Sequence, residues 1–242
     1  MMKEHFSIRI LGGIFAFALI PGSGHSQLPS PPSNSQADLH IRVVLSQSGK
    51  HRSVPVVIWL QPLPGTSVLP FKAKGRYILE QKNRTFVPHL QVVPVGSSVQ
   101  FPNEDPFFHN VFSLFDGKRF DLGLYEAGSS KSVTFSREGI SYIFCNIHPE
   151  MSAVVISLTT PLYAIANGND PITLRNIPFG DYRMQIWIEG VPQSILEKLF
   201  RDIHIQAGGT DLGELKVPIP TSRNSHTNEF GHPYEQVPES PY

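Results

Sequence analysis

Residues 142–151 read Tyr-Ile-Phe-Cys-Asn-Ile-His-Pro-Glu-Met, a short apolar run that leads directly into three potential metal ligands. Residues 142–144 predict the end of a strand. Cys145, His148 and Met151 follow at three-residue intervals. A thiolate, an imidazole and a thioether with this spacing can converge on one point if residues 145–151 form a loop. We therefore expect a strand that ends in a ligand loop.

The ligand types point to one metal chemistry. Type 1 (blue) copper is held by two imidazoles and one thiolate in a near-trigonal plane, with a weak thioether on the axis. The loop lacks one imidazole, and His109 is the natural donor because it follows a strand end and turn at residues 101–108. A ligand from a separate strand makes the site depend on the folded protein. The sequence predicts one copper, with His109, Cys145, His148 and Met151 as its ligands.

Two motifs carry a resemblance to a known family. Residues 99–111 read Val-x-Phe-x-Asn-x-Asp-x-x-x-His-Asn-Val, and residues 145–151 read Cys-x-x-His-x-x-Met. This pattern resembles the cupredoxins, with an amicyanin-like ligand loop, over Arg76 to Leu158. Residues 120–125, together with residues 145–148, further resemble bacterial periplasmic proteins of the plastocyanin-like, methylamine-utilisation-like type.

The resemblance implies a fold, a cofactor and roles for particular residues. The fold would be a Greek-key β-sandwich with a single mononuclear copper and outer-sphere electron transfer. His109, Cys145 and His148 would be equatorial ligands and Met151 the axial one. Asn110 would hydrogen-bond across to the cysteine loop and stabilise the thiolate. His148 would pass the electron through an apolar surface patch, for which the candidates are Phe107, Phe108 and Pro149.

Other interpretations of Cys145 remain open. It is the only cysteine, and a single cysteine is often a small buried packing residue. A structural zinc site prefers four Cys, His or carboxylate ligands and gains little from a thioether. A cysteine nucleophile with His148 as its base would be unusual on a loop at this spacing, and no third orienting group is evident. A multicopper oxidase needs several His-x-His pairs, and the sequence has none.

Both ends of the chain differ in composition from the middle. Lys3 and Arg9 precede an apolar run and then small residues, which predicts a secretory signal peptide over residues 1–26, cleaved near Ser26-Gln27. A membrane anchor is the alternative, but the run is shorter than the ~20 residues that a spanning helix needs. Residues 27–37 are interpreted as a linker and residues 218–242 as a disordered tail. We expect a mature chain without a membrane span, in the periplasm or secreted.

Strand-like segments also flank the predicted copper domain of residues 76–160 on both sides. Residues 38–75 form an N-terminal group, and residues 161–217 form an accessory β module with a short helix at residues 194–200. Residues 172–182 resemble a carboxypeptidase-regulatory-like β-sandwich module. The strands around Trp59 (VVIWL) and Trp187 (MQIWI) look alike, which raises the hypothesis that the first strands pair with the last. The predicted fold class is all-β, a Greek-key cupredoxin sandwich with a smaller accessory β-sandwich.

Charge and composition narrow the function. Lysine and arginine (20) balance aspartate and glutamate (20), so no field of one sign attracts nucleic acid. We expect a non-enzymatic electron carrier that works with a redox partner protein. The alternative is an exported copper-binding envelope or adhesion module whose metal is structural or stored. His89 is expected to be a hydrogen-bonded structural histidine, with an approach to the metal or to an electron-transfer face as the alternative.

Overall fold

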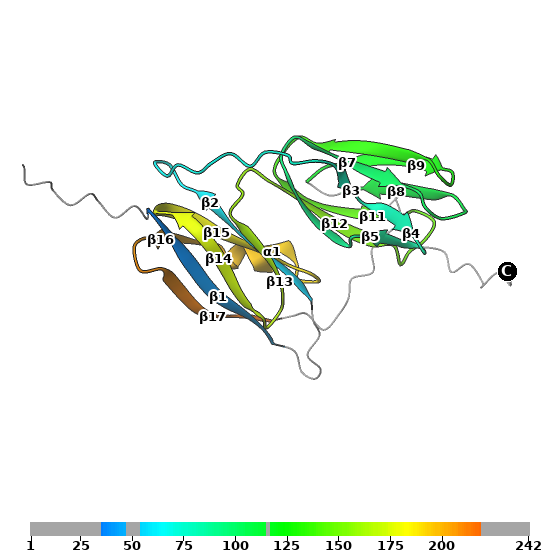
Figure 1. Cartoon of the computed structure of the whole chain (residues 1–242). Coiled ribbons are helices and arrows are strands. Elements are labelled where there is room, and N and C mark those ends of the chain that lie inside the picture. Colours follow the sequence, from blue (N-terminus) through cyan, green and yellow to red (C-terminus); the bar gives the residue numbers. More distant parts are fainter. Residues whose placement is uncertain (1–34, 47–53, 115–116, 219–242) are drawn as a thin grey trace, which may run out of the picture. The chain divides into compact units, whose positions relative to one another are not determined.

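The ligand sequences lie on a central lobe built of two sheets and a hairpin. The computed structural model describes residues 35–46, 54–114 and 117–218 (Figure 1). The strands of the central lobe are β3 (Tyr77–Ile78), β4 (Glu80–Lys82), β5 (Thr85–Val87), β6 (Leu90–Pro94), β7 (Ser97–Pro102), β8 (His109–Ser113), β9 (Phe120–Tyr125), β10 (Ser130–Phe135), β11 (Gly139–Phe144) and β12 (Ser152–Leu158). The orders are β6-β12-β11-β8-β9 and β10-β7-β3, and β4 pairs with β5.

The two sheets of the central lobe enclose a core of alternate residues. On β7, Val99 and Phe101 are buried, while Ser98 is exposed and Gln100 is half-buried. On β10, Val133 and Phe135 are buried and Thr134 is exposed. This period of two is what a strand with one face in a core requires. The prediction of an all-β fold is confirmed, because strands dominate the described residues.

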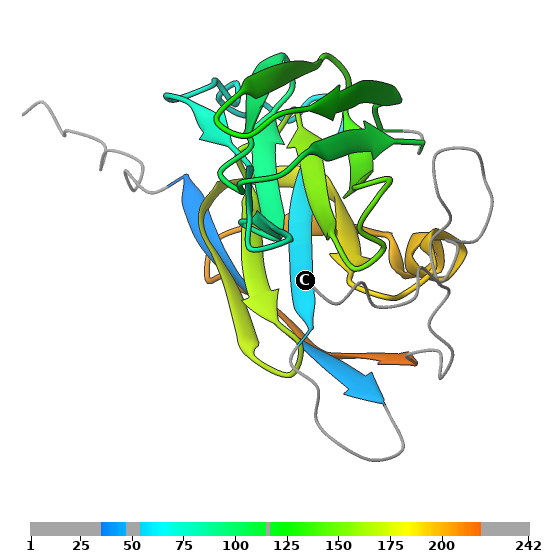
Figure 2. The ribbon, with the colours of Figure 1, turned by 90° about the vertical axis from the view of Figure 1, so that its right-hand side faces the viewer.

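The remaining strands form a flanking lobe of two further sheets. They are β1 (Gln36–Ser46), β2 (Pro55–Pro62), β13 (Tyr163–Asn167), β14 (Pro171–Pro178), β15 (Gly180–Ile188), β16 (Arg201–Ile205) and β17 (Thr210–Pro218). The orders are β14-β1-β17 and β13-β2-β15-β16. The two tryptophan strands pair directly, with Val57 opposite Trp187 and Trp59 opposite Gln185. Figures 1 and 2 show β1, in blue, beside β17, in orange. The central lobe is thus inserted between the strands of the flanking lobe.

Strand β12 is buried on both faces and joins the two lobes. Ala153 and Val155 belong to the core of the central lobe. Val154 and Ile156 belong instead to the core that contains Trp187 of the flanking lobe. The Trp187 indole N–H also donates to the hydroxyl of Tyr142 on β11, at 3.0 Å. The flanking lobe therefore covers the outer face of the sheet that carries the ligand loop, at β12 and β11.

The structure differs from the sequence expectations at several points. β1 begins at Gln36, inside the expected linker of residues 27–37, because Gln36 and Ala37 pair with β14. The expected helix of residues 194–200 is α1 (Gln193–Leu196) followed by a 3₁₀ turn, η1 (Glu197–Leu199). The hairpin β4–β5, with its turn at Asn83 and Arg84, was not predicted. The predicted signal peptide, residues 27–34 of the linker and residues 219–242 of the tail lie outside the described residues.

No helix in the described part of the chain is long and apolar enough to cross a membrane.

His89 forms a polar link between the lobes. Its Nδ1 lies 2.9 Å from the carbonyl oxygen of Ser152 on β12, and its Nε2 lies 2.7 Å from Oε1 of Glu189, just after β15. Both ring nitrogens face oxygen acceptors, so both bonds are satisfied only when a proton is held between His89 and Glu189. The hydrogen bond to Glu189 raises the pKa of His89 against the opposing effect of burial. His89 is thus a structural histidine between Ser152 and Glu189.

This link predicts a pH-dependent contribution to stability. It is fully present below pH 6.5, the ordinary pKa of histidine, and is lost as the pH rises through the higher pKa of the folded state. Because the side chains are 41% and 38% exposed, we expect at most about 1 kcal/mol. Urea unfolding of the wild type and of Glu189→Gln from mildly acidic to alkaline pH checks this. The variant should be less stable at low pH and equal at high pH, and an unchanged pH profile would contradict the prediction.

Candidate metal centre

The fold brings His109 and the loop 145–151 together through adjacent strands. His109 is the first residue of β8, and the loop connects β11 to β12. β11 pairs antiparallel with β8 through Phe144 and Phe112, so the chain after β11 runs toward the start of β8. Two backbone bonds close the loop. The N–H of Met151 donates to the carbonyl of His148 at 3.0 Å, and the N–H of Cys145 donates to that of Met151 at 3.3 Å.

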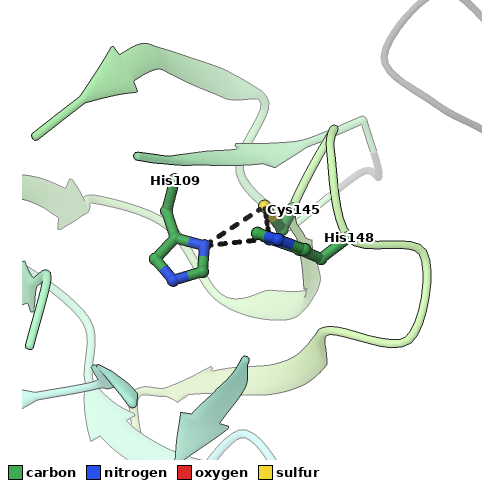
Figure 3. Close-up of side chains that lie close together, drawn as sticks. All are labelled: His109, Cys145 and His148. Carbon is green, nitrogen blue, oxygen red and sulfur yellow. Dashed lines mark hydrogen bonds between the residues drawn. The ribbon is translucent and has the colours of Figure 1, made fainter. Parts of the chain in front are cut away.

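Three of the predicted ligands present their donor atoms to one another (Figure 3). Cys145 Sγ lies 3.7 Å from His109 Nδ1 and 3.6 Å from His148 Nδ1, and the two Nδ1 atoms are 3.1 Å apart. A point equidistant from the corners of this triangle lies about 2.0 Å from each atom, close to the ~2.0–2.3 Å of metal–nitrogen and metal–sulfur bonds. The three residues therefore fit a single metal ion without rearrangement.

The surroundings of Cys145 suit a thiolate that is stabilised by a metal. Burial raises the pKa of the Cys145 thiol, and the backbone N–H groups of Asn110, Ile147 and His148 oppose this effect. The net pKa is above its ordinary value, so the thiol without a cation stays protonated at neutral pH. A bound cation would favour the thiolate, and the N–H donors are already in place for it.

Asn110 ties the loop to two strands. Its side-chain Oδ1 accepts from the N–H of Asn146 at 3.3 Å, and its Nδ2 donates to Asp121 Oδ1 on β9 at 2.7 Å. Its own backbone N–H is directed to Cys145. Asn110 thus contacts the cysteine loop with both its backbone and its side chain.

His148 lies at the surface end of the cluster, where apolar side chains gather. Burial, followed by the nearby His109, lowers the pKa of His148, so its imidazole is neutral and can offer Nδ1 to a metal. The Phe107 ring lies 5.6 Å from the His148 ring and 5.2 Å from the His109 ring, between ring centres. Phe108 and Ile147 are 56% and 46% exposed. Phe107 and Ile147 thus place apolar side chains beside His148, and Phe108, the chain neighbour of Phe107, is exposed.

Met151 is fully buried in the same core cluster as Cys145. Its backbone bonds hold it to the loop that carries the other two ligands. Within the described part of the chain, no other histidine, cysteine, aspartate or glutamate joins the cluster of His109, Cys145 and His148. Met151 therefore stays the predicted fourth ligand, and a thioether is a ligand that zinc does not favour.

One residue of this site had no role in the sequence interpretation. Asp105 is buried, and its Oδ2 lies 2.9 Å from His109 Nε2, on the side of the ring opposite the cluster. Burial raises the pKa of Asp105, but bonds from the Arg84 N–H, from His109 and from the Asn83 N–H outweigh it, so the net pKa is lowered. Asp105 is the Asp of the motif Asn-x-Asp-x-x-x-His, four residues before the histidine, which is the signal that could have identified it.

Comparison with known proteins finds similarity at the level of solved structures. No protein-family profile and no curated protein sequence matches this chain. One similar structure is a Cu-containing nitrite reductase from Thermus scotoductus, with 24% identity, a TM-score of 0.34 and coverage of 40% of this chain. This chain spans only 25% of the length of that reductase.

Two smaller copper proteins are also similar to parts of this chain. A purple cupredoxin from Nitrosopumilus maritimus has 22% identity and a TM-score of 0.31, over 34% of this chain and 99% of its own. A Cu(I) form of an amicyanin variant has 20% identity and a TM-score of 0.33, over 42% of this chain and 98% of its own. Each match covers less than half of this chain.

Proposed function

We propose that this chain is an exported electron carrier that holds one type 1 copper on His109, Cys145, His148 and Met151. The observation that supports this most directly is the triangle of two Nδ1 atoms and one Sγ atom, with sides of 3.1 to 3.7 Å. Two imidazoles and one thiolate in a plane, with a thioether nearby, form the ligand set of blue copper. When bound, copper would supply one-electron chemistry between Cu(II) and Cu(I).

The protein residues around the site support electron transfer without substrate turnover. Met151 would be the fourth residue that holds the copper, so all four ligands would come from the protein. A ligand set fixed before the metal enters keeps the rearrangement between the two oxidation states small. The apolar patch at Phe107, Phe108 and Ile147 beside His148 would be the contact for a redox partner protein.

Loading the protein with Cu(II) tests this proposal. We expect one copper per chain, an intense visible thiolate-to-copper band and a fast electron self-exchange measured by NMR line broadening. Zinc-loaded protein is the matched control, because it fills the same ligands without a band and without exchange. A copper protein with slow exchange would instead support a stored or structural metal in an envelope module. A protein that binds copper without the visible band would contradict the type 1 site.

A further inference from the structure

Asp105 is held in one position by four hydrogen bonds. Its carboxylate accepts from the N–H of Asn83 at 2.6 Å and from the N–H of Arg84 at 2.9 Å, and its Oδ2 is hydrogen-bonded to His109 Nε2 at 2.9 Å. Its own N–H donates to Asn103 Oδ1 at 3.1 Å. Asp105 is only 5% exposed, so water does not compete for the carboxylate.

The two backbone N–H donors come from the tip of the hairpin β4–β5. Asn83 and Arg84 both have a φ of 54°, the left-handed conformation of a two-residue hairpin turn. Successive N–H groups in such a turn can converge on one anion. The turn therefore forms a backbone cradle that fixes both oxygens of Asp105.

The fixed carboxylate determines which nitrogen of His109 carries the proton. An ionised carboxylate only accepts hydrogen bonds, so Nε2 of His109 must be protonated. The neutral ring then has its lone pair on Nδ1, the atom that faces Cys145 and His148. The opposite tautomer would direct an N–H at the metal position and could not bind an ion there.

The same hairpin tip is also linked to His148, through the ring of Phe107. The guanidinium of Arg84 lies over the Phe107 ring, 5.3 Å from its centre. That ring contacts His148 as well as His109. One turn thus braces His109 through Asp105 and His148 through Phe107.

We propose that Asp105 is a positioning residue, which holds His109 in the Nε2-protonated tautomer before a metal binds and lowers the reduction potential of the bound copper. The second part rests on the proposed copper function. A carboxylate that accepts from a ligating imidazole raises the basicity of that ligand, and a more basic ligand favours Cu(II) over Cu(I).

The first measurement uses the metal-free full chain. Long-range ¹H–¹⁵N NMR of the wild type should show His109 as a single Nε2–H tautomer, and Asp105→Asn should show a mixture. Nδ1–H in the wild type overturns the proposal, and this reading stands even if the variant does not fold. A single Nε2–H tautomer in a folded Asp105→Asn variant overturns it as well. This readout is independent of whether the protein is a type 1 copper protein.

The second measurement uses copper-loaded protein and a charge control. Asp105→Asn should lower copper affinity about 10- to 100-fold and raise the reduction potential. Glu104→Gln removes a neighbouring exposed carboxylate that makes no side-chain bond to the site among the described contacts, and it should change neither. Equal shifts in the two variants would overturn the potential-lowering role. If the wild type gives no type 1 band while the NMR result holds, the copper function fails and the tautomer assignment stands.

Discussion

Cys145→Ser is expected to abolish the intense visible band of the copper-loaded protein and to weaken copper binding by several orders of magnitude. The band requires a thiolate on the metal, and a serine hydroxyl does not ionise at neutral pH. Because the chain has a single cysteine, no other thiol can replace it. Visible absorption and a copper titration of the variant measure both effects.

Met151→Leu is the matched comparison, because it changes a buried neighbour of similar volume in the same loop. The thioether of a blue-copper site is a weak axial ligand. This variant should therefore keep the visible band and show a changed reduction potential. A Cys145→Ser protein that keeps its colour would rule out the proposed ligand set. A colourless Met151→Leu protein would contradict the weak axial role of Met151, because the visible band would then depend on the thioether.

Trp187→Ala is expected to lower the free energy of unfolding by about 3–5 kcal/mol, the range for removing a fully buried large aromatic side chain. Trp187 has no exposed surface and packs in the core that also contains Val154 and Ile156 of β12. Its loss leaves a cavity between the lobes and removes the bond to the Tyr142 hydroxyl. Urea unfolding followed by far-UV circular dichroism and by the copper band should show one shared transition, shifted for both signals.

Trp187→Phe is the control for the hydrogen bond. It keeps an aromatic ring in the core but loses the indole N–H, so it should cost less than the alanine variant, with about 1 kcal/mol from the bond itself. Two separate transitions, with only the circular dichroism signal shifted by Trp187→Ala, would show that the lobes unfold independently. The shared core would then contribute little to the central lobe.

The ligand loop was predictable because its information is local. Three potential ligand types within residues 145–151 predict the chemistry, and a neighbouring strand brings His109 to Cys145 and His148. The role of Asp105 was not predictable in the same way. It depends on a hairpin whose strands have three residues each, and whose turn lacks the glycine that usually marks a left-handed conformation.

The burial of β12 on both faces is visible in its sequence, although the sequence interpretation did not use it. Residues 153–156 read Ala-Val-Val-Ile, without the alternation expected of a strand with one wet face. A continuous apolar run is typical of a strand buried on both sides. Composition alone also predicted a linker that extends too far, to residue 37. Gln36 and Ala37 belong to β1 because they pair with β14, a contact distant in sequence.

The insertion of the central lobe between β2 and β13 affects how the chain is made. Of the described strands, β1 is synthesised first and is among the last to find all its partners, because Leu39 on β1 pairs with Thr210 on β17. Contacts between residues so distant in sequence form slowly. During synthesis, the backbone N–H and C=O groups of β1 and β2 therefore stay unpaired, while the inserted strands can already pair among themselves. The N-terminal strands are thus the segment for which protection from aggregation matters most until the last strand has been synthesised.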